Sequence, residues 1–134
     1  MSSTNQSHPA SRASLWAGRI LSALAILLFI VTASFGFLKP AVTMQGFVHY
    51  GYPEGAMLRI TIVEIVCAIV YAIPRTSVLG AILLTGYLGG ATATHVRVGE
   101  PFFLPILVGV VIWLGLYLRD KRLRALVPLR DSEN

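Results

Sequence analysis

An acidic residue lies in the middle of one of the most apolar stretches of this chain. Cys67 and Tyr71 follow Glu64 at positions i+3 and i+7, so the three side chains share one face if the stretch is helical. Ionisable groups in such surroundings face the interior of a helix bundle and find partners there. Two interpretations stay open for Glu64: a site that exchanges a proton or binds a ligand, or a carboxyl group held by an arginine or hydroxyl of another helix.

Arg59 precedes this carboxyl group by five residues on the same stretch. In a helix this spacing sets the two side chains about 140° apart around the axis, so they do not form a pair along the helix. Either Glu64 has its partner on another helix, or Arg59 extends to the surface of the membrane.

A second group of polar residues flanks the apolar stretches on one predicted side of the membrane. It consists of Lys39, His49, Tyr50, Tyr52, Glu54, Arg59, His95, Arg97 and Glu100. Such a polar cap could hold an anionic or quinone-like headgroup, with arginines supplying charge and tyrosines stacking on a ring. The alternative is a set of ordinary loops with interfacial tyrosines and anchoring cations. Metal-site spacing is absent around His49 and His95, and Cys67 is the only cysteine, so we predict no metal site.

Small residues form a stripe on the third apolar stretch. Gly86, Gly89, Gly90 and Ala93 lie on one helical face, which suits close packing against another helix in lipid. We expect this contact within the chain, and a homodimer interface is the alternative.

The elements that position these residues are predicted to be membrane-spanning helices. Of the 134 residues, 55% are hydrophobic and only 13% are charged, about half the charged fraction of a soluble domain. Four apolar stretches, residues 20–38, 56–73, 78–95 and 102–118, are each close to the length that crosses a bilayer. Prolines and glycines separate them. The fold class is therefore all-α, a four-transmembrane-helix bundle.

Charge distribution sets the expected orientation. Lys39, Arg59 and Arg97 fall on one side and the other eight cations on the opposite side, which places both termini in the cytoplasm. Residues 1–14 and 129–134 read as tails around a membrane domain of residues 15–128. A cleaved signal peptide ending near Ala33 is the alternative for the first span. The net charge of +5 is mostly a topology signal, and the cluster from Arg119 to Arg124 indicates attraction to anionic lipid headgroups rather than nucleic-acid binding.

The chain resembles the DoxX-like family of membrane proteins from about Leu15 to Pro128. The resemblance rests on the run from Leu84 to His95, on Arg97-x-Gly99-Glu100-Pro101, on the ending Leu116 to Arg124, and on Glu64 within an apolar helix. It implies a four-helix integral membrane protein with links to membrane redox complexes and quinones. It carries no catalytic motif onto any residue of this chain.

The expected function is an accessory or small-molecule-binding subunit of a membrane complex, with redox subunits as partners and a quinone as the implied cofactor. We expect it in the bacterial inner (plasma) membrane. The alternative is a small proton-coupled transporter in which Glu64 carries the proton. No catalytic motif is present, so any enzymatic role would be that of a quinone-linked oxidoreductase subunit with turnover sensitive to His95 and Arg97.

Overall fold

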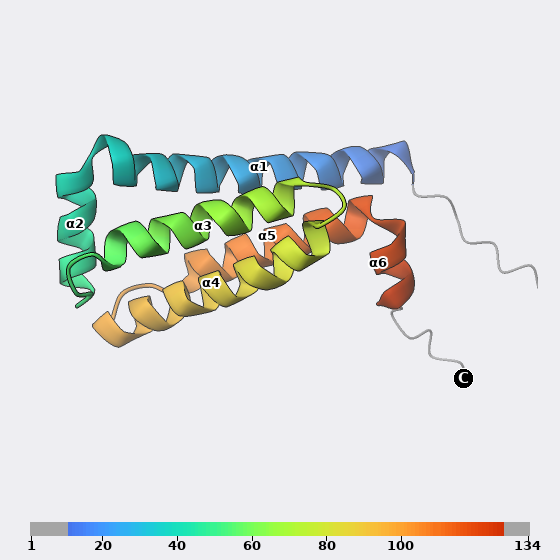
Figure 1. Ribbon diagram of the computed structural model, residues 1–134. Coiled ribbons are helices and arrows are strands. Elements are labelled where there is room, and N and C mark those ends of the chain that lie inside the picture. Colours follow the sequence, from blue (N-terminus) through green and yellow to red (C-terminus); the bar gives the residue numbers. More distant parts are fainter. Residues whose placement is uncertain (1–10, 128–134) are drawn as a thin grey trace, which may run out of the picture.

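The computed structural model describes residues 11–127, which form helices joined by short connections (Figure 1). The long helices are α1 (Arg12–Leu38), α3 (Ala56–Ala72), α4 (Ser77–Val98) and α5 (Phe103–Arg119), and the short ones are α2 (Pro40–His49) and α6 (Lys121–Leu126). We call the end of the bundle where α2 lies the α2 end. The opposite end, which carries α6 and the connection between α3 and α4, is the α6 end (Figure 1).

The long helices form a ring in which sequence neighbours run in opposite directions. Helix α1 packs against α3 and α5, and α4 packs against the same two helices (Figure 1). Helix α2 runs across one end of this ring and contacts α1 and α3. The all-α class predicted from the sequence is confirmed for the described residues. Two helices, α1 and α4, are long and apolar enough to cross a membrane, and α5 is a shorter apolar helix.

The helices begin and end close to the predicted positions, with three differences. Helix α1 begins at Arg12, because the Ser11 side chain caps it by accepting from the Ser14 amide at 3.2 Å. Residues 12–14, assigned to a tail, are therefore helical. Residues 40–49, predicted as loop, form α2, and the short α6 follows the last predicted span. The predicted tails at residues 1–10 and 129–134 lie outside the described residues.

Local backbone chemistry explains the helix boundaries. Pro40 occupies the first turn of α2, where its missing N–H costs nothing. Gly55 before α3 and Gly99 after α4 have φ of 81° and 75°, values that side chains with a Cβ rarely adopt. Asp120 caps α6 by accepting from the amides of Arg122 and Leu123 at 2.8 and 3.3 Å. These breaks hold the polar residues at the two ends of the bundle.

The interior combines apolar side chains with close helix contacts. The core includes Ala25, Phe29, Tyr71, Ala81, Leu84, Leu88, Ile112 and Leu116. A Cβ at Gly80 would lie 2.3 Å from the backbone of Tyr71, and one at Gly18 would lie 2.7 Å from the Gly115 carbonyl oxygen. The helices approach most closely at these glycines.

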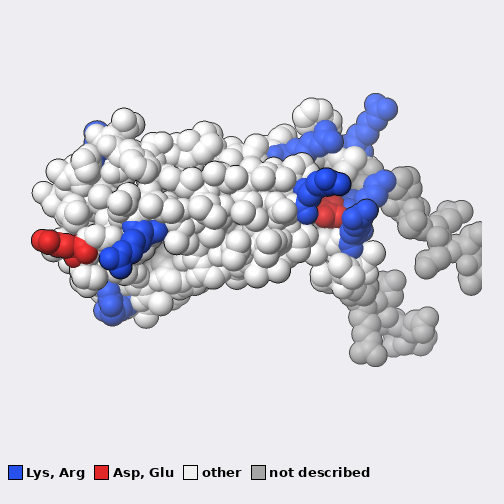
Figure 2. All heavy atoms as spheres, in the orientation of Figure 1, with Lys and Arg blue, Asp and Glu red and all other residues white. Residues whose placement is uncertain are grey.

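The outer surface of the helices is also apolar. Leu24, Ile62 and Leu107 are each about half exposed, at 55%, 49% and 59%. Figure 2 shows charged side chains gathered at the two ends of the molecule, with an uncharged belt between them. An apolar surface of this extent marks a protein that contacts lipid or other proteins.

Candidate functional site

The acidic residue singled out in the sequence is enclosed between three helices. Glu64 lies on α3 and is 6% exposed. The Thr32 hydroxyl of α1 donates to its carboxyl group, and the Tyr87 hydroxyl of α4 contacts the same group. Of the two interpretations of Glu64, this geometry fits the carboxyl group that is held by side chains of other helices. The partners are hydroxyl groups rather than an arginine. Because Tyr87 also lines a cavity, the carboxyl group lies one side chain away from that cavity.

The cavity beside Tyr87 has a volume of about 350 Å³ and reaches the α2 end. Its wall consists of Phe47, Tyr50, Tyr52, Ile60, Gly86, Tyr87, Gly90, Ala91, Thr94 and His95. We call it the aromatic pocket. Most of its lining is apolar and aromatic, with a few polar atoms, as in pockets that bind small molecules. The Tyr87 ring is held edge-on against Phe29 of α1, with ring centroids 6.2 Å apart.

Two glycines make the space for this pocket. A Cβ at Gly86 or Gly90 would meet no atom within 4 Å. Both residues are exposed, so the α4 wall of the pocket opens to the apolar surface of the bundle. A larger side chain at either position would extend into the open space.

Hydrogen bonds fix the polar atoms of the pocket mainly as acceptors. The Thr94 hydroxyl donates to the Gly90 carbonyl at 2.9 Å, so the Tyr52 hydroxyl, 2.6 Å from Thr94, is the donor of that pair. His95 Nδ1 lies 2.8 Å from the Ala91 carbonyl and must therefore carry a hydrogen. In the neutral ring, Nε2 is then an acceptor. The Tyr52 oxygen and His95 Nε2 both suit a ligand that donates hydrogen bonds.

Polar residues above the pocket form a connected cluster at the α2 end. Glu100 accepts from His49 Nε2 and from the Tyr50 hydroxyl, both at 3.0 Å. Arg97 donates to the Tyr50 carbonyl, and its guanidinium lies 5.8 Å from the centre of the Tyr52 ring. These contacts tie the connection after α4 to the connection after α2.

Hydrogen bonding also sets the ionisation of this cluster. Bonds from Tyr50 and then His49 stabilise the Glu100 carboxylate and lower its pKa below the ordinary value of 4.5. The pKa of Tyr50 is raised above 10.0, first by burial and then by its bond to the Glu100 carboxylate. Glu100 is therefore ionised and Tyr50 protonated at neutral pH.

The structure brings some of the predicted site residues together and separates others. His49, His95, Arg97 and Glu100 all lie at the α2 end, around or above the aromatic pocket. Arg59 is exposed on α3.

Tyr71 lies in the other half of the bundle. It is fully buried and bonds to the Ser22 hydroxyl and the Ile112 carbonyl, both at 3.0 Å. Glu64, Cys67 and Tyr71 do share the buried face of α3, as the spacing predicted.

The small-residue stripe does not pack as expected within the chain. Gly86, Gly89, Gly90 and Ala93 are all exposed, and a Cβ at any of the three glycines would contact nothing within 4 Å. Helix α4 instead uses Gly80, Ala81, Leu84 and Leu88 as its buried face. The expectation of an intrachain contact is therefore wrong, because helical periodicity defines a face without saying which face meets a neighbour. The homodimer alternative stays a prediction.

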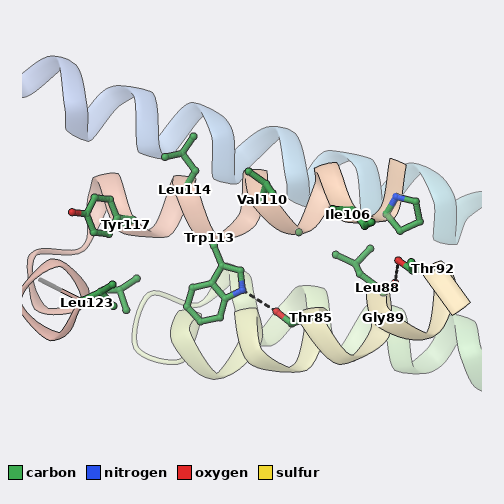
Figure 3. A pocket seen from close by; sticks show the side chains of 13 residues that line it. Thr85, Leu88, Gly89, Thr92, Ile106, Val110, Trp113, Leu114, Tyr117 and Leu123 are labelled. Atoms are coloured by element: carbon green, nitrogen blue, oxygen red, sulfur yellow. Dashed lines mark hydrogen bonds between the residues drawn. The ribbon is translucent and has the colours of Figure 1, made fainter. Parts of the chain in front are cut away.

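Between α4 and α5 lies a wider and more uniform groove of about 690 Å³ (Figure 3). Its sides carry Leu88, Val110 and Leu114, and the Trp113 indole donates to the Thr85 hydroxyl at 2.9 Å (Figure 3). The bond satisfies the polar atoms of this pair. The groove is shaped for hydrocarbon and offers little to a polar ligand.

Most residues of the aromatic pocket were not among the binding residues predicted from the sequence. Tyr87 and Thr94 stood only in a family-like run, and Tyr52 only among the cap residues. No signal in the sequence connected Tyr87 with Glu64, because the two residues lie on different helices, α4 and α3. Within residues 11–127, no group of three or more His, Cys, Asp or Glu side chains could hold a metal ion.

Comparison with known proteins places the chain in a family. The model of the DoxX-like family matches residues 20–116, a range that contains all of α3 and α4, most of α1 and α5, and Glu64, Tyr87 and His95. The chain belongs to this family of membrane proteins. No curated protein and no solved structure matches it.

Proposed function

We propose that this DoxX-like membrane protein binds the ring of a quinone-class amphiphile in its aromatic pocket, as a non-catalytic subunit of a membrane complex. The observation that carries the proposal is the aromatic pocket itself, whose deep wall, Tyr87, contacts the buried carboxyl group of Glu64. In this arrangement all four long helices cross the bilayer of a bacterial inner membrane. The distribution of Lys and Arg residues supports a topology in which the α6 end and both termini lie in the cytoplasm.

The shape and chemistry of the pocket favour a hydroxylated ring. Tyr50, Tyr52 and Phe47 provide flat apolar faces for stacking, and the open α4 wall gives an isoprenoid or alkyl tail access to surrounding lipid. Because Tyr52 and His95 present acceptors, the reduced quinol, whose hydroxyl groups donate, fits better than the oxidised quinone. A buried acceptor left without a donor costs about 1–3 kcal/mol, so the two redox forms should differ about tenfold or more in affinity.

A direct binding measurement tests this proposal. The full chain in lipid nanodiscs is titrated under anaerobic conditions with decylubiquinol and, separately, with decylubiquinone. We expect saturable binding with the quinol tighter. Tyr52→Phe removes one of the two acceptors at the pocket wall and should weaken quinol binding about fivefold, the loss of one hydrogen bond. Tyr117→Phe on α5, which does not line the pocket, is the matched control. Equal affinities for the two forms, or equal losses in both variants, would contradict the proposal.

The subunit role has its own test. Purification from native membranes in a mild detergent, followed by mass spectrometry of proteins and lipophilic molecules, should recover partner proteins together with a bound quinone. Recovery of the chain alone and without quinone would count against a subunit of a quinone-linked complex.

Proton-coupled transport is the second candidate, favoured by the contact between Glu64 and a pocket residue. Here a proton would pass from the carboxyl group through the Tyr87 hydroxyl as substrate leaves the pocket. Flux driven by a pH gradient across proteoliposomes should then disappear in Glu64→Gln. Unchanged flux in that variant eliminates Glu64 as the coupling group.

A further inference from the structure

A second polar hollow lies at the α6 end, opposite the aromatic pocket. It has a volume of about 680 Å³ and is lined by Arg19, Pro74, Arg75, Ser77, Leu116, Arg119, Asp120, Lys121 and Arg122. We call it the basic pocket. Helix α1, the connection between α3 and α4, and the last turn of α5 with the start of α6 each contribute cations. Figure 2 shows this gathering of Lys and Arg side chains around an acidic residue.

The positive charge of this pocket is not balanced within the described part of the chain. Asp120 is the single acid in the lining, and its Oδ1 accepts from two amides at the start of α6. The salt bridge between His49 and Glu100 is the one found among residues 11–127, and it lies at the α2 end. Five cations therefore face a shared hollow with one carboxylate that is already engaged in capping.

One of these cations is held rigidly in place. The Arg119 guanidinium lies 5.5 Å from the centre of the fully buried Tyr71 ring, and its Nη2 donates to Ser77 Oγ at 3.2 Å. Ser77 is 2% exposed and donates in turn to the Ile73 carbonyl at 3.0 Å. A guanidinium fixed on two sides loses little conformational entropy when it binds a ligand.

This arginine also keeps a donor without a partner. Arg119 Nε is buried and makes no hydrogen bond among the described residues. A buried donor of this kind is costly unless an acceptor satisfies it. The unused bonding capacity of Arg119 therefore belongs to a residue that lines the basic pocket.

We propose that the basic pocket binds a phosphate group. A phosphate group is anionic both in a lipid and as the free ion, and its tetrahedral oxygens accept from donors that converge from different elements. Carboxylates are planar and suit the fork of a single arginine better than donors that converge from several elements. The site is independent of the aromatic pocket and of the function proposed for it.

The phosphate could belong to an anionic lipid or to a soluble compound, and the surroundings bear on both sources. Trp16, Ile20 and Leu79 on the adjacent helices are exposed apolar residues, at 61%, 55% and 53%. Basic pockets beside such surfaces bind the headgroups of anionic lipids. Inorganic phosphate presents the same oxygens without acyl chains.

Native mass spectrometry of the full chain released from detergent tests the proposal. The probes are phosphatidylglycerol, phosphatidylcholine of matched chain length, and inorganic phosphate. Arg75→Gln, Lys121→Gln and Arg122→Gln are combined in a pocket variant, since these three side chains are exposed and their loss should leave the fold intact. Arg12→Gln, Lys39→Gln and Arg59→Gln form a control variant with the same loss of charge outside the pocket.

The expected result is binding of phosphatidylglycerol over phosphatidylcholine, lost by roughly tenfold or more in the pocket variant and kept in the control variant. Displacement of that lipid by phosphate identifies the phosphate group as the recognised part. Binding of inorganic phosphate alone, lost in the pocket variant, supports the same site with a soluble ligand. Equal loss of binding in both variants would mean that only general charge attraction is at work, and it would overturn the proposal. The proposal would also be overturned if neither phosphatidylglycerol nor inorganic phosphate bound.

Discussion

The two halves of the bundle use the same small residue in opposite ways. In the α6 half, Gly80 lets α4 touch the backbone of Tyr71, and Gly18 lets α1 touch Gly115. In the α2 half, Gly86 and Gly90 touch nothing within 4 Å and leave the aromatic pocket open. Gly80 and Gly18 therefore permit close helix contact, whereas Gly86 and Gly90 leave open space. Glycine on a membrane helix indicates a short side chain, and its surroundings decide whether this produces contact or space.

The two halves also differ in how far their buried polar groups are hydrogen-bonded. In the α6 half the Tyr71 hydroxyl is saturated by Ser22 and the Ile112 carbonyl, deep in the core. In the α2 half, Tyr52 and His95 each keep an acceptor at a cavity wall. Saturated polar groups stabilise a fold, whereas polar atoms with remaining capacity can recognise a ligand. We therefore expect substitutions in the first half to change stability and substitutions in the second to change binding.

The largest effect on stability is expected at Gly80. A valine there would place its Cβ 2.3 Å from the Tyr71 backbone, which no rotamer change relieves. Gly80→Val should lower the free energy of unfolding by about 3 kcal/mol or more. Gly89→Val is the matched control, because its Cβ would meet open space on the same helix. Thermal unfolding in detergent, followed by circular dichroism, measures both, and equal midpoints would contradict the contrast.

The largest effect on binding is expected at Gly90. Leucine at this position fills part of the aromatic pocket, so Gly90→Leu should weaken quinol binding about tenfold or more while the unfolding midpoint changes little. Gly89→Leu, one residue away, points into the groove of Figure 3 and should leave affinity unchanged. Titration in nanodiscs gives both affinities. A Gly90→Leu chain that binds normally would remove the pocket from the proposed function.

The fold could be predicted from the sequence, but most of the difference between the two halves of the bundle could not. Hydropathy and the flanking Pro and Gly residues located the four long helices within a few residues, except at the start of α1. Periodicity correctly put Glu64, Cys67 and Tyr71 on one buried face. Helix α2 was missed because its ten residues are too few to span a membrane and mix polar with apolar types.

The partners of those residues could not be predicted, because they come from other helices. Glu64 meets Thr32 and Tyr87, which are 32 and 23 positions away along the chain and depend on how α1, α3 and α4 pack. His49 and Glu100 were expected in one cap, and they do bond to each other. The glycine stripe was expected to pack against another helix of the chain, but it is exposed on α4.

Effects of intermediate size, on stability and on quinol affinity, are expected from substituting one tyrosine in each half. Tyr71→Phe removes the hydroxyl that bonds the buried Ser22 side chain and should cost about 1–2 kcal/mol of unfolding free energy. Quinol affinity should stay unchanged, because Tyr71 does not line the aromatic pocket. Tyr52→Phe, in contrast, should weaken quinol binding about fivefold, because it removes an acceptor at the wall of the aromatic pocket. Chemical denaturation and ligand titration on the two variants separate these outcomes, and a loss of affinity in Tyr71→Phe would show that the halves are coupled.

The smallest effect is expected from the exposed cluster around Glu100, and it depends on pH. Since hydrogen bonds from Tyr50 and His49 hold the folded-state pKa of Glu100 below 4.5, the ionised carboxylate stabilises the folded chain above that pH. The stabilisation is lost as the pH falls through the folded-state pKa, where the carboxylate takes up a proton. Glu100→Gln should therefore lower the unfolding midpoint slightly at pH 7, and this difference from the wild type should shrink towards pH 3. Melting curves of both chains across this range provide the measurement. A difference that grows on acidification would mean that the neutral acid, rather than the carboxylate, joins the α2 connection to the end of α4.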